Sequence, residues 1–182
     1  MDNKQDGADH NGNITLIVEI YPYKTMKIIF LDFDGVMDTI YYNNYLEYMG
    51  QPIADQFGLL FDPDCQANLK RIIDVTGAKI VVSSTWKDCM SHEEIVKMWE
   101  QRNLAGEVIG ETPSFSKVRG DEIDSWLEDF TKPCNYVIID DMDSYQFNEH
   151  QLPHLFTVNP YNGLTEDIAE QIIAALNQCH LH

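Results

Sequence analysis

The chain has 182 residues, 44% of them apolar and 11% aromatic, which is the composition of a globular domain and not of a disordered segment. Its 30 acidic and 12 basic residues give a formal charge of −18, which disfavours capture of nucleic acid, although a local basic pocket would still permit it. We expect no membrane span and no export signal, because no long apolar run and no basic leader is visible. Four widely spaced cysteines without a C-x-x-C pair indicate reduced thiols and a cytoplasmic protein.

The chain begins with a polar stretch, and we expect residues 1–13 to form a disordered tail and residues 14–182 a single domain. Residues 14–20 could add an edge strand, which Pro22 would end. Residues 26–33 are almost continuously apolar, a pattern that indicates a strand buried on both faces of a parallel sheet.

Helices and strands then alternate. Asp62 and Pro63 predict the start of a helix, and Gly77 predicts its end. Residues 79–82 form a second apolar run, which predicts another buried strand. A capping-box sequence that begins at Ser91 predicts the next helix.

The second half of the chain continues this alternation. We expect a short strand over residues 107–109, a helix that begins near Gly120, buried strands over residues 136–139 and 155–158, and a last helix capped by Thr165. The pattern predicts an α/β fold: a Rossmann-like three-layer sandwich with a mainly parallel central sheet and helices on both faces. The segments between strands are too short for a large cap domain.

Three of the predicted strands are followed by carboxyl or hydroxyl groups: Asp32 and Asp34, Ser83 and Ser84, and Asp140 and Asp141. Two basic residues, Lys117 and Arg119, precede the helix that leads into the third of these strands. Because ligands of such sheets bind beyond the carboxyl ends of the strands, we expect these side chains to converge. Clustered carboxylates raise each other's pKa, and a hard cation such as Mg²⁺ removes that repulsion.

These residue types suit phosphoryl transfer. Asp32 could attack phosphorus and form an aspartyl-phosphate, which divides one difficult step into two. The turn at Gly35 could bring Asp34 toward the leaving oxygen, where it would first protonate that oxygen and then activate water. Ser83 could donate a hydrogen bond to a phosphate oxygen, and Arg119 offers a bidentate guanidinium at a helix start.

Four motifs resemble those of the haloacid dehalogenase-like hydrolases. A buried strand followed by DFDGV resembles their first motif, KIVVSS the second, RGDEI the third and YVIIDD the fourth, in the family's order. The patterns S-S-x-W-K, E-I-x-x-W-L and Y-V-I-x-D-D further resemble a subgroup of small domains, some of which accompany nucleic-acid repair modules. The resemblance implies a minimal-cap phosphatase.

This resemblance also implies a role for each matched residue. Asp32 would be the nucleophile and Asp34 the general acid and base, while Mg²⁺ would bind Asp32, the Asp34 carbonyl and Asp141, with Asp140 in support. Ser83 and Arg119 would bind the substrate phosphate.

Two positions leave alternatives open. The family more often has Lys in its third motif, so Lys117 could replace Arg119 as the phosphate ligand. Ser83 and Ser84 stand side by side, and Ser83 is preferred because it directly follows the apolar run.

The expected activity is Mg²⁺-dependent hydrolysis of a phosphomonoester, either a phosphorylated small molecule or the phosphate end of a larger substrate, because capless relatives have open sites. Two alternatives are a catalytically silent phosphate- or metal-binding domain of the same fold and a phosphoacceptor receiver domain. Residues 41–48 contain four tyrosines, which could stack on a ring-bearing substrate or pack as a flap on the core. Asp38 is expected to solvate a loop.

Overall fold

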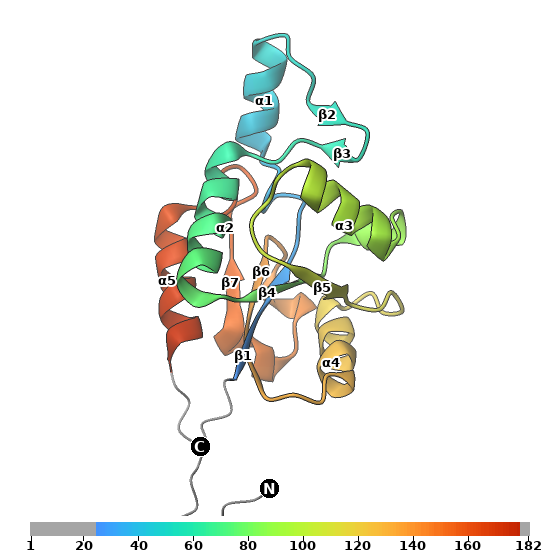
Figure 1. The fold of residues 1–182 in the computed structure, drawn as a ribbon, viewed down its shortest axis with the longest axis vertical. Helices are drawn as coiled ribbons and strands as arrows, with labels where there is room; N and C mark the ends of the chain where they lie inside the picture. The colour runs from blue at the N-terminus through green and yellow to red at the C-terminus, as the bar shows by residue number, and fades with distance from the viewer. Residues whose placement is uncertain (1–24, 179–182) are drawn as a thin grey trace, which may run out of the picture.

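The computed structural model describes residues 25–178, so the expected tail over residues 1–13 and the expected strand over residues 14–20 lie outside the described residues. The described chain is an α/β sandwich built on a five-stranded parallel sheet (Figure 1). Its strands, in chain order, are β1 (Met26–Leu31), β4 (Lys79–Val82), β5 (Val108–Glu111), β6 (Cys134–Asp140) and β7 (Leu155–Thr157). All five were predicted, with boundaries that differ by no more than two residues.

The first strand lies at the centre of the sheet, whose order is β5-β4-β1-β6-β7. If the five strands of this sheet are numbered 1 to 5 along the chain, their order is 3-2-1-4-5. Receiver domains have the order 2-1-3-4-5, so the receiver alternative is wrong. Leu31 of β1 is in register with Val82 of β4 and Ile139 of β6. The residues that follow these three strands therefore emerge side by side.

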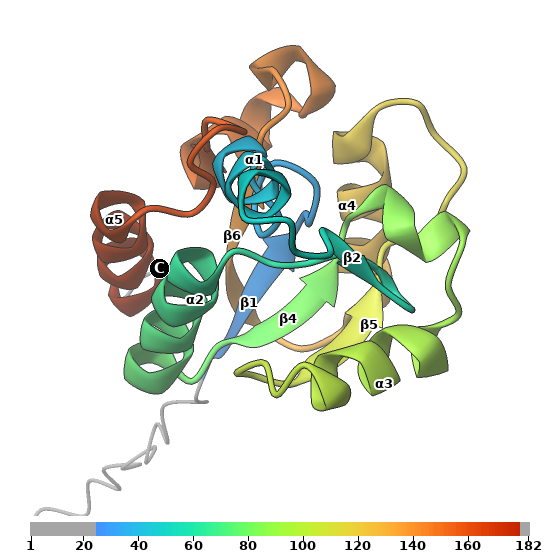
Figure 2. The same cartoon turned by 90° about the horizontal axis from the view of Figure 1, so that it is seen from above.

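Helices cover both faces of the sheet (Figure 2). One face packs against α2 (Pro63–Thr76), α3 (His92–Gln101) and α5 (Glu166–Asn177). The other packs against α4 (Arg119–Asp129) and the segment of short 3-10 helices η2 (Ser144–Gln146) and η3 (Glu149–His154). Alternate β1 residues face the two layers, with Ile29 in the first core and Phe30 in the second, and this two-sided burial explains the continuous apolar run.

The predicted helix ends are confirmed. The Asp62 side chain accepts a hydrogen bond from the backbone N–H of Asp64, and Gly77 ends α2 with φ at +66°. Ser91 and Glu94 form a complete capping box at the start of α3. Local sequence signals thus place the helices that flank the site.

A short helix and hairpin, which the sequence did not predict, connect β1 to α2. They comprise α1 (Ile40–Tyr48), β2 (Ala54–Asp55) and β3 (Gly58–Leu59), and α1 stands beyond the carboxyl edge of the sheet (Figure 1). Leu46 is the buried residue of α1, while Tyr41, Tyr45 and Tyr48 are 48–88% exposed, so these tyrosines do not pack on the core. No large cap is inserted between residues 25 and 178, and no helix in that range is long and apolar enough to span a membrane.

Candidate active site

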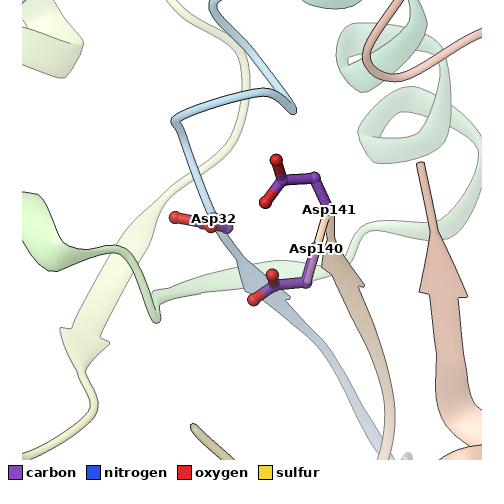
Figure 3. A group of neighbouring side chains, drawn as sticks. All are labelled: Asp32, Asp140 and Asp141. Carbon is purple, nitrogen blue, oxygen red and sulfur yellow. The ribbon is translucent and has the colours of Figure 1, made fainter. Parts of the chain in front are cut away.

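Three carboxylates converge at the carboxyl edge of the sheet. Asp32 follows β1, and Asp140 and Asp141 lie at the end of β6, so that one oxygen from each lies within 4.8 Å of the others (Figure 3). The side chains of Asp32 and Asp140 are almost completely buried, whereas Asp141 is partly exposed. The cluster therefore has one side that is open to a ligand.

Backbone hydrogen bonds fix the orientation of this cluster. The Asp32 N–H donates to the Ile139 carbonyl at 3.1 Å, which ties the end of β1 to β6. The Phe33 N–H donates to Asp32 Oδ1 at 2.8 Å, and the Met142 N–H donates to Asp140 Oδ1 at 2.9 Å. The two buried carboxylates are thus held by the backbone, which leaves their other oxygens for a further partner.

Glycine is required where the chain turns away from the nucleophile candidate. Gly35 has φ at +70°, a conformation that disfavours other residues. A Cβ at this position would overlap Asp141 Oδ2 and lie 2.9 Å from Pro160 Cβ. The turn therefore fits closely against both the acidic cluster and the segment that follows β7.

Burial raises the pKa of all three carboxyls, and neighbouring carboxylates add to each shift. Burial, followed by the charge of Asp140, raises the pKa of Asp32 from 3.8 to about 7. Burial also raises the pKa of Asp140 and of Asp141, although the Arg119 guanidinium opposes both shifts. A hard divalent cation would relieve this repulsion, and the all-oxygen donor set fits Mg²⁺.

Arg119 lies against the cluster and is only 6% exposed. Its Nη1 lies 3.6 Å from Asp32 Oδ1 and 3.3 Å from Asp140 Oδ2, and it also donates to the Ser83 carbonyl. The Asp140 contact has an ion-pair distance but lacks hydrogen-bond alignment. Lys117, by contrast, is exposed and forms no ion pair within residues 25–178, so the structure brings Arg119 and not Lys117 to the carboxylates.

The two adjacent serines have different environments. Ser83 is completely buried, and its hydroxyl has no hydrogen-bond partner among the described residues. The Ser84 hydroxyl accepts the Trp86 N–H at 3.4 Å and also hydrogen-bonds to Asp32, which lowers the pKa of that carboxyl. A buried hydroxyl normally has a hydrogen-bond partner. The Ser83 hydroxyl has none within residues 25–178, so it is the serine donor that remains for a ligand.

Asp34 lies at the exposed side of the site, and its partners were not predicted from the sequence. Trp86 Nε1 donates to Asp34 Oδ1 at 2.9 Å, and the Thr85 hydroxyl donates to Asp34 Oδ2 at 3.5 Å. Trp86 also packs edge-on against Phe33. Both donors come from the 3-10 helix η1 (Thr85–Asp88), so the segment after β4 orients the carboxylate that follows β1.

The expected environment of Asp38 needs correction, and Lys87 has a buried partner. Asp38 is only 4% exposed rather than in a solvated loop, and burial, followed by the charge of Asp34, raises its pKa to about 7. Lys87, which the S-S-x-W-K pattern places near the site, forms a buried ion pair with Glu122 at 3.0 Å. Glu122 also accepts two backbone N–H groups of the loop before α4, so this pair fixes the segments that carry Ser83 and Arg119.

Comparison with known proteins identifies the family. Residues 28–169 match the family model described as "HAD domain in Swiss Army Knife RNA repair proteins", a match that spans most of the chain and all four motifs. Searches of the curated proteins and of the solved structures found no match. The resemblance inferred from the motifs is therefore confirmed, and the chain belongs to the HAD domains of Swiss Army Knife RNA repair proteins.

Proposed function

We propose that this domain is a Mg²⁺-dependent phosphatase that removes a terminal phosphate from RNA. The observation that carries the proposal is the position of Asp32, which is buried beside Asp140 and Asp141 and faces Arg119 at the open edge of the sheet. The name of the matched family indicates the substrate. The absence of a large cap among residues 25–178 supports it, because an open site admits the end of a polymer.

Asp32, Asp141 and the Asp34 carbonyl would hold the metal, with Asp140 in support. The bound Mg²⁺ would supply positive charge to the phosphoryl oxygens. Arg119 contributes a second positive charge from within the fold, and the unpaired Ser83 hydroxyl provides a donor for a third phosphate oxygen. The phosphoryl group would therefore be contacted by the metal held after β1 and β6, by Ser83 after β4 and by Arg119 at the start of α4.

The reaction would proceed in two steps. First, a carboxylate oxygen of Asp32 attacks phosphorus, the bond to the ribose oxygen breaks, and Asp34 gives its proton to that oxygen to release an alcohol. Second, Asp34 takes a proton from water, the resulting hydroxide attacks the aspartyl-phosphate, and Asp32 is regenerated with release of inorganic phosphate. Trp86 and Thr85 support both steps, since their hydrogen bonds hold the Asp34 carboxyl in position.

The proposal is tested by hydrolysis of an aryl phosphate and of RNA oligonucleotides with a 3′- or a 5′-phosphate, each with Mg²⁺ and with a chelator. We expect Mg²⁺-dependent release of phosphate by the wild type and none by Asp32→Asn, which preserves the size of the side chain. We expect Asp34→Asn to release about one equivalent of the aryl alcohol and then stop, because the good leaving group needs no acid but the intermediate needs a base.

Binding of Mg²⁺ without turnover of any of these substrates would refute the proposal and would favour the catalytically silent alternative. Turnover that persists in Asp32→Asn would refute the assignment of the nucleophile.

A further inference from the structure

Two half-exposed tyrosines lie together next to the turn at Gly35, which follows Asp32 and Asp34. Tyr41 at the start of α1 and Tyr161 after β7 are 52% and 47% exposed, and their ring centroids are 5.9 Å apart with a 60° angle between the planes. Each tyrosine thus keeps about half of its surface accessible to solvent, and an accessible aromatic ring can stack on a nucleobase.

The backbone fixes this tyrosine pair relative to the site. The Tyr41 N–H donates to the Tyr161 carbonyl at 3.2 Å, and the Ile40 N–H donates to the Pro160 carbonyl at 3.0 Å. Pro160 in turn lies so close to Gly35 that a Cβ there would be 2.9 Å from Pro160 Cβ. Figure 2 shows α1 over the end of β1 and beside the loop that enters α5. The tyrosines therefore border the segment that carries Asp34.

Both tyrosines line a cavity of about 710 Å³, a size that accommodates a nucleobase with its sugar. Its wall also includes the carboxylates of Asp64 and Glu166 and the amide of Asn162. These carboxylates repel phosphate, whereas they accept hydrogen bonds from the amino groups of bases. The cavity therefore suits the base of a nucleotide and not its phosphate.

Charge also argues for recognition through the base. Most basic side chains of the described chain are paired with carboxylates: Lys70, Arg71, Lys79, Lys87, Arg102 and Arg119. With a net charge of −18, the protein has little positive surface to follow a phosphodiester backbone. Stacking on aromatic rings is independent of that charge and tolerates every base.

We infer that Tyr41 and Tyr161 bind the nucleobase next to the scissile phosphate by stacking, so that the domain recognises the terminal nucleotide and not an extended strand. This inference rests on the proposed function and adds the feature that separates an RNA end from other phosphomonoesters.

The test compares two RNA oligonucleotides with the same terminal phosphate, one with an intact terminal base and one with an abasic terminal ribose. The readout is the ratio of their kcat/KM values. Wild type should prefer the intact end by about tenfold, and Tyr41→Ala/Tyr161→Ala should bring the ratio close to one. Tyr41→Phe/Tyr161→Phe should keep the preference, since the π-faces remain. Tyr48→Ala, at an 88% exposed position of α1 outside the cavity, is the matched control and should also keep it.

A second readout is how the kinetic constants depend on salt concentration and on the length of the RNA substrate. The KM for the intact end should change by no more than about threefold between 50 and 200 mM salt, whereas several phosphate contacts would change it by orders of magnitude. A nucleoside monophosphate should be nearly as good a substrate as an oligonucleotide. A steep dependence on salt or on length would overturn the inference.

The same pair of ends is also compared by equilibrium binding to Asp32→Asn protein, which needs no turnover. Failure of wild type to hydrolyse even an aryl phosphate would reject the proposed function, while the binding comparison would still decide the role of the tyrosines. An abasic end that binds as tightly as the intact end, or a base preference that survives in the double alanine variant, would overturn the inference alone.

Discussion

Replacement of Asp32 by Asn should stabilise the metal-free protein at pH 8. Asp32 is 3% exposed, and burial, followed by the charge of Asp140, raises its pKa from 3.8 to about 7. The shift is about three units, and each unit corresponds to about 1.36 kcal/mol, so the ionised carboxylate opposes folding by about 4 kcal/mol. Asparagine removes this charge and can still accept the Phe33 N–H through its side-chain oxygen.

The direction of the pH dependence follows from the raised pKa. The folded protein retains the Asp32 proton up to about pH 7, whereas the unfolded chain releases it near pH 4. The stability that the protonated Asp32 carboxyl contributes is therefore fully present below about pH 4 and is lost as the pH rises through 7. The free energy of unfolding of Asp32→Asn should exceed that of wild type by about 1.5 kcal/mol at pH 5 and by about 4 kcal/mol at pH 8.

Urea denaturation with a chelator at pH 5 and pH 8 measures this difference. Asp129→Asn, a change at an exposed carboxylate at the end of α4, serves as the control and should show no such dependence. Mg²⁺ at about 100 times its Kd should restore about 2.7 kcal/mol to wild type and much less to Asp32→Asn. A destabilised Asp32→Asn at pH 8, or a difference that is the same at both pH values, would refute the reasoning.

Three other substitutions test the site and its support. Gly35→Ala should weaken Mg²⁺ binding at least about tenfold in calorimetric titrations, because the new Cβ overlaps Asp141 Oδ2; unchanged affinity would contradict this. Arg119→Ala should lower kcat/KM by about 10²–10³, while Lys117→Ala should change it less than about twofold. Equal losses in the two variants would reject Arg119 as the phosphate-binding side chain. Glu122→Ala should cost about 3–5 kcal/mol in urea denaturation, because it leaves a buried lysine and two backbone N–H groups unpaired; a loss below about 1 kcal/mol would disprove that role.

The buried strands and the identity of the clustered carboxylates were predictable because both depend on local sequence. A strand with two covered faces must be apolar throughout, so the run that ends at Leu31 is unmistakable, and Asp32 necessarily lies at its carboxyl end. Parallel strands then bring Asp140 to the same edge, whatever the details of their order.

The segment between β1 and α2 could not be predicted in the same way. Helix α1 has one buried residue, Leu46, and hence no apolar stripe for a sequence pattern to reveal. Its start depends on Thr39, whose hydroxyl accepts the Tyr42 N–H at 3.0 Å and donates to Asp62 at 2.7 Å. The partner lies 23 residues further along the chain, so the contact is set by tertiary structure and is invisible to local patterns.

Tertiary structure likewise decides which polar residues near the motifs already have a hydrogen-bond or ion-pair partner within the protein. Lys87 and Glu122 are 35 residues apart, and Trp86 reaches Asp34 across 52 residues. Neither partner is implied by spacing alone. The sequence therefore indicates which groups gather at the sheet edge, while only the fold shows which of them are already engaged.

The central position of β1 has a consequence for biosynthesis. Asp32 is synthesised 108 residues before its neighbour across the sheet, Asp140, so β6 pairs with β1 only after α2, β4, α3, β5 and α4 have been made. Such non-local pairing is slow, because a long loop must close before the contacts form. A nascent chain that ends before β6 would contain Asp32 and the serines but neither Asp140 nor Asp141, so the acidic cluster forms only after β6 has been made.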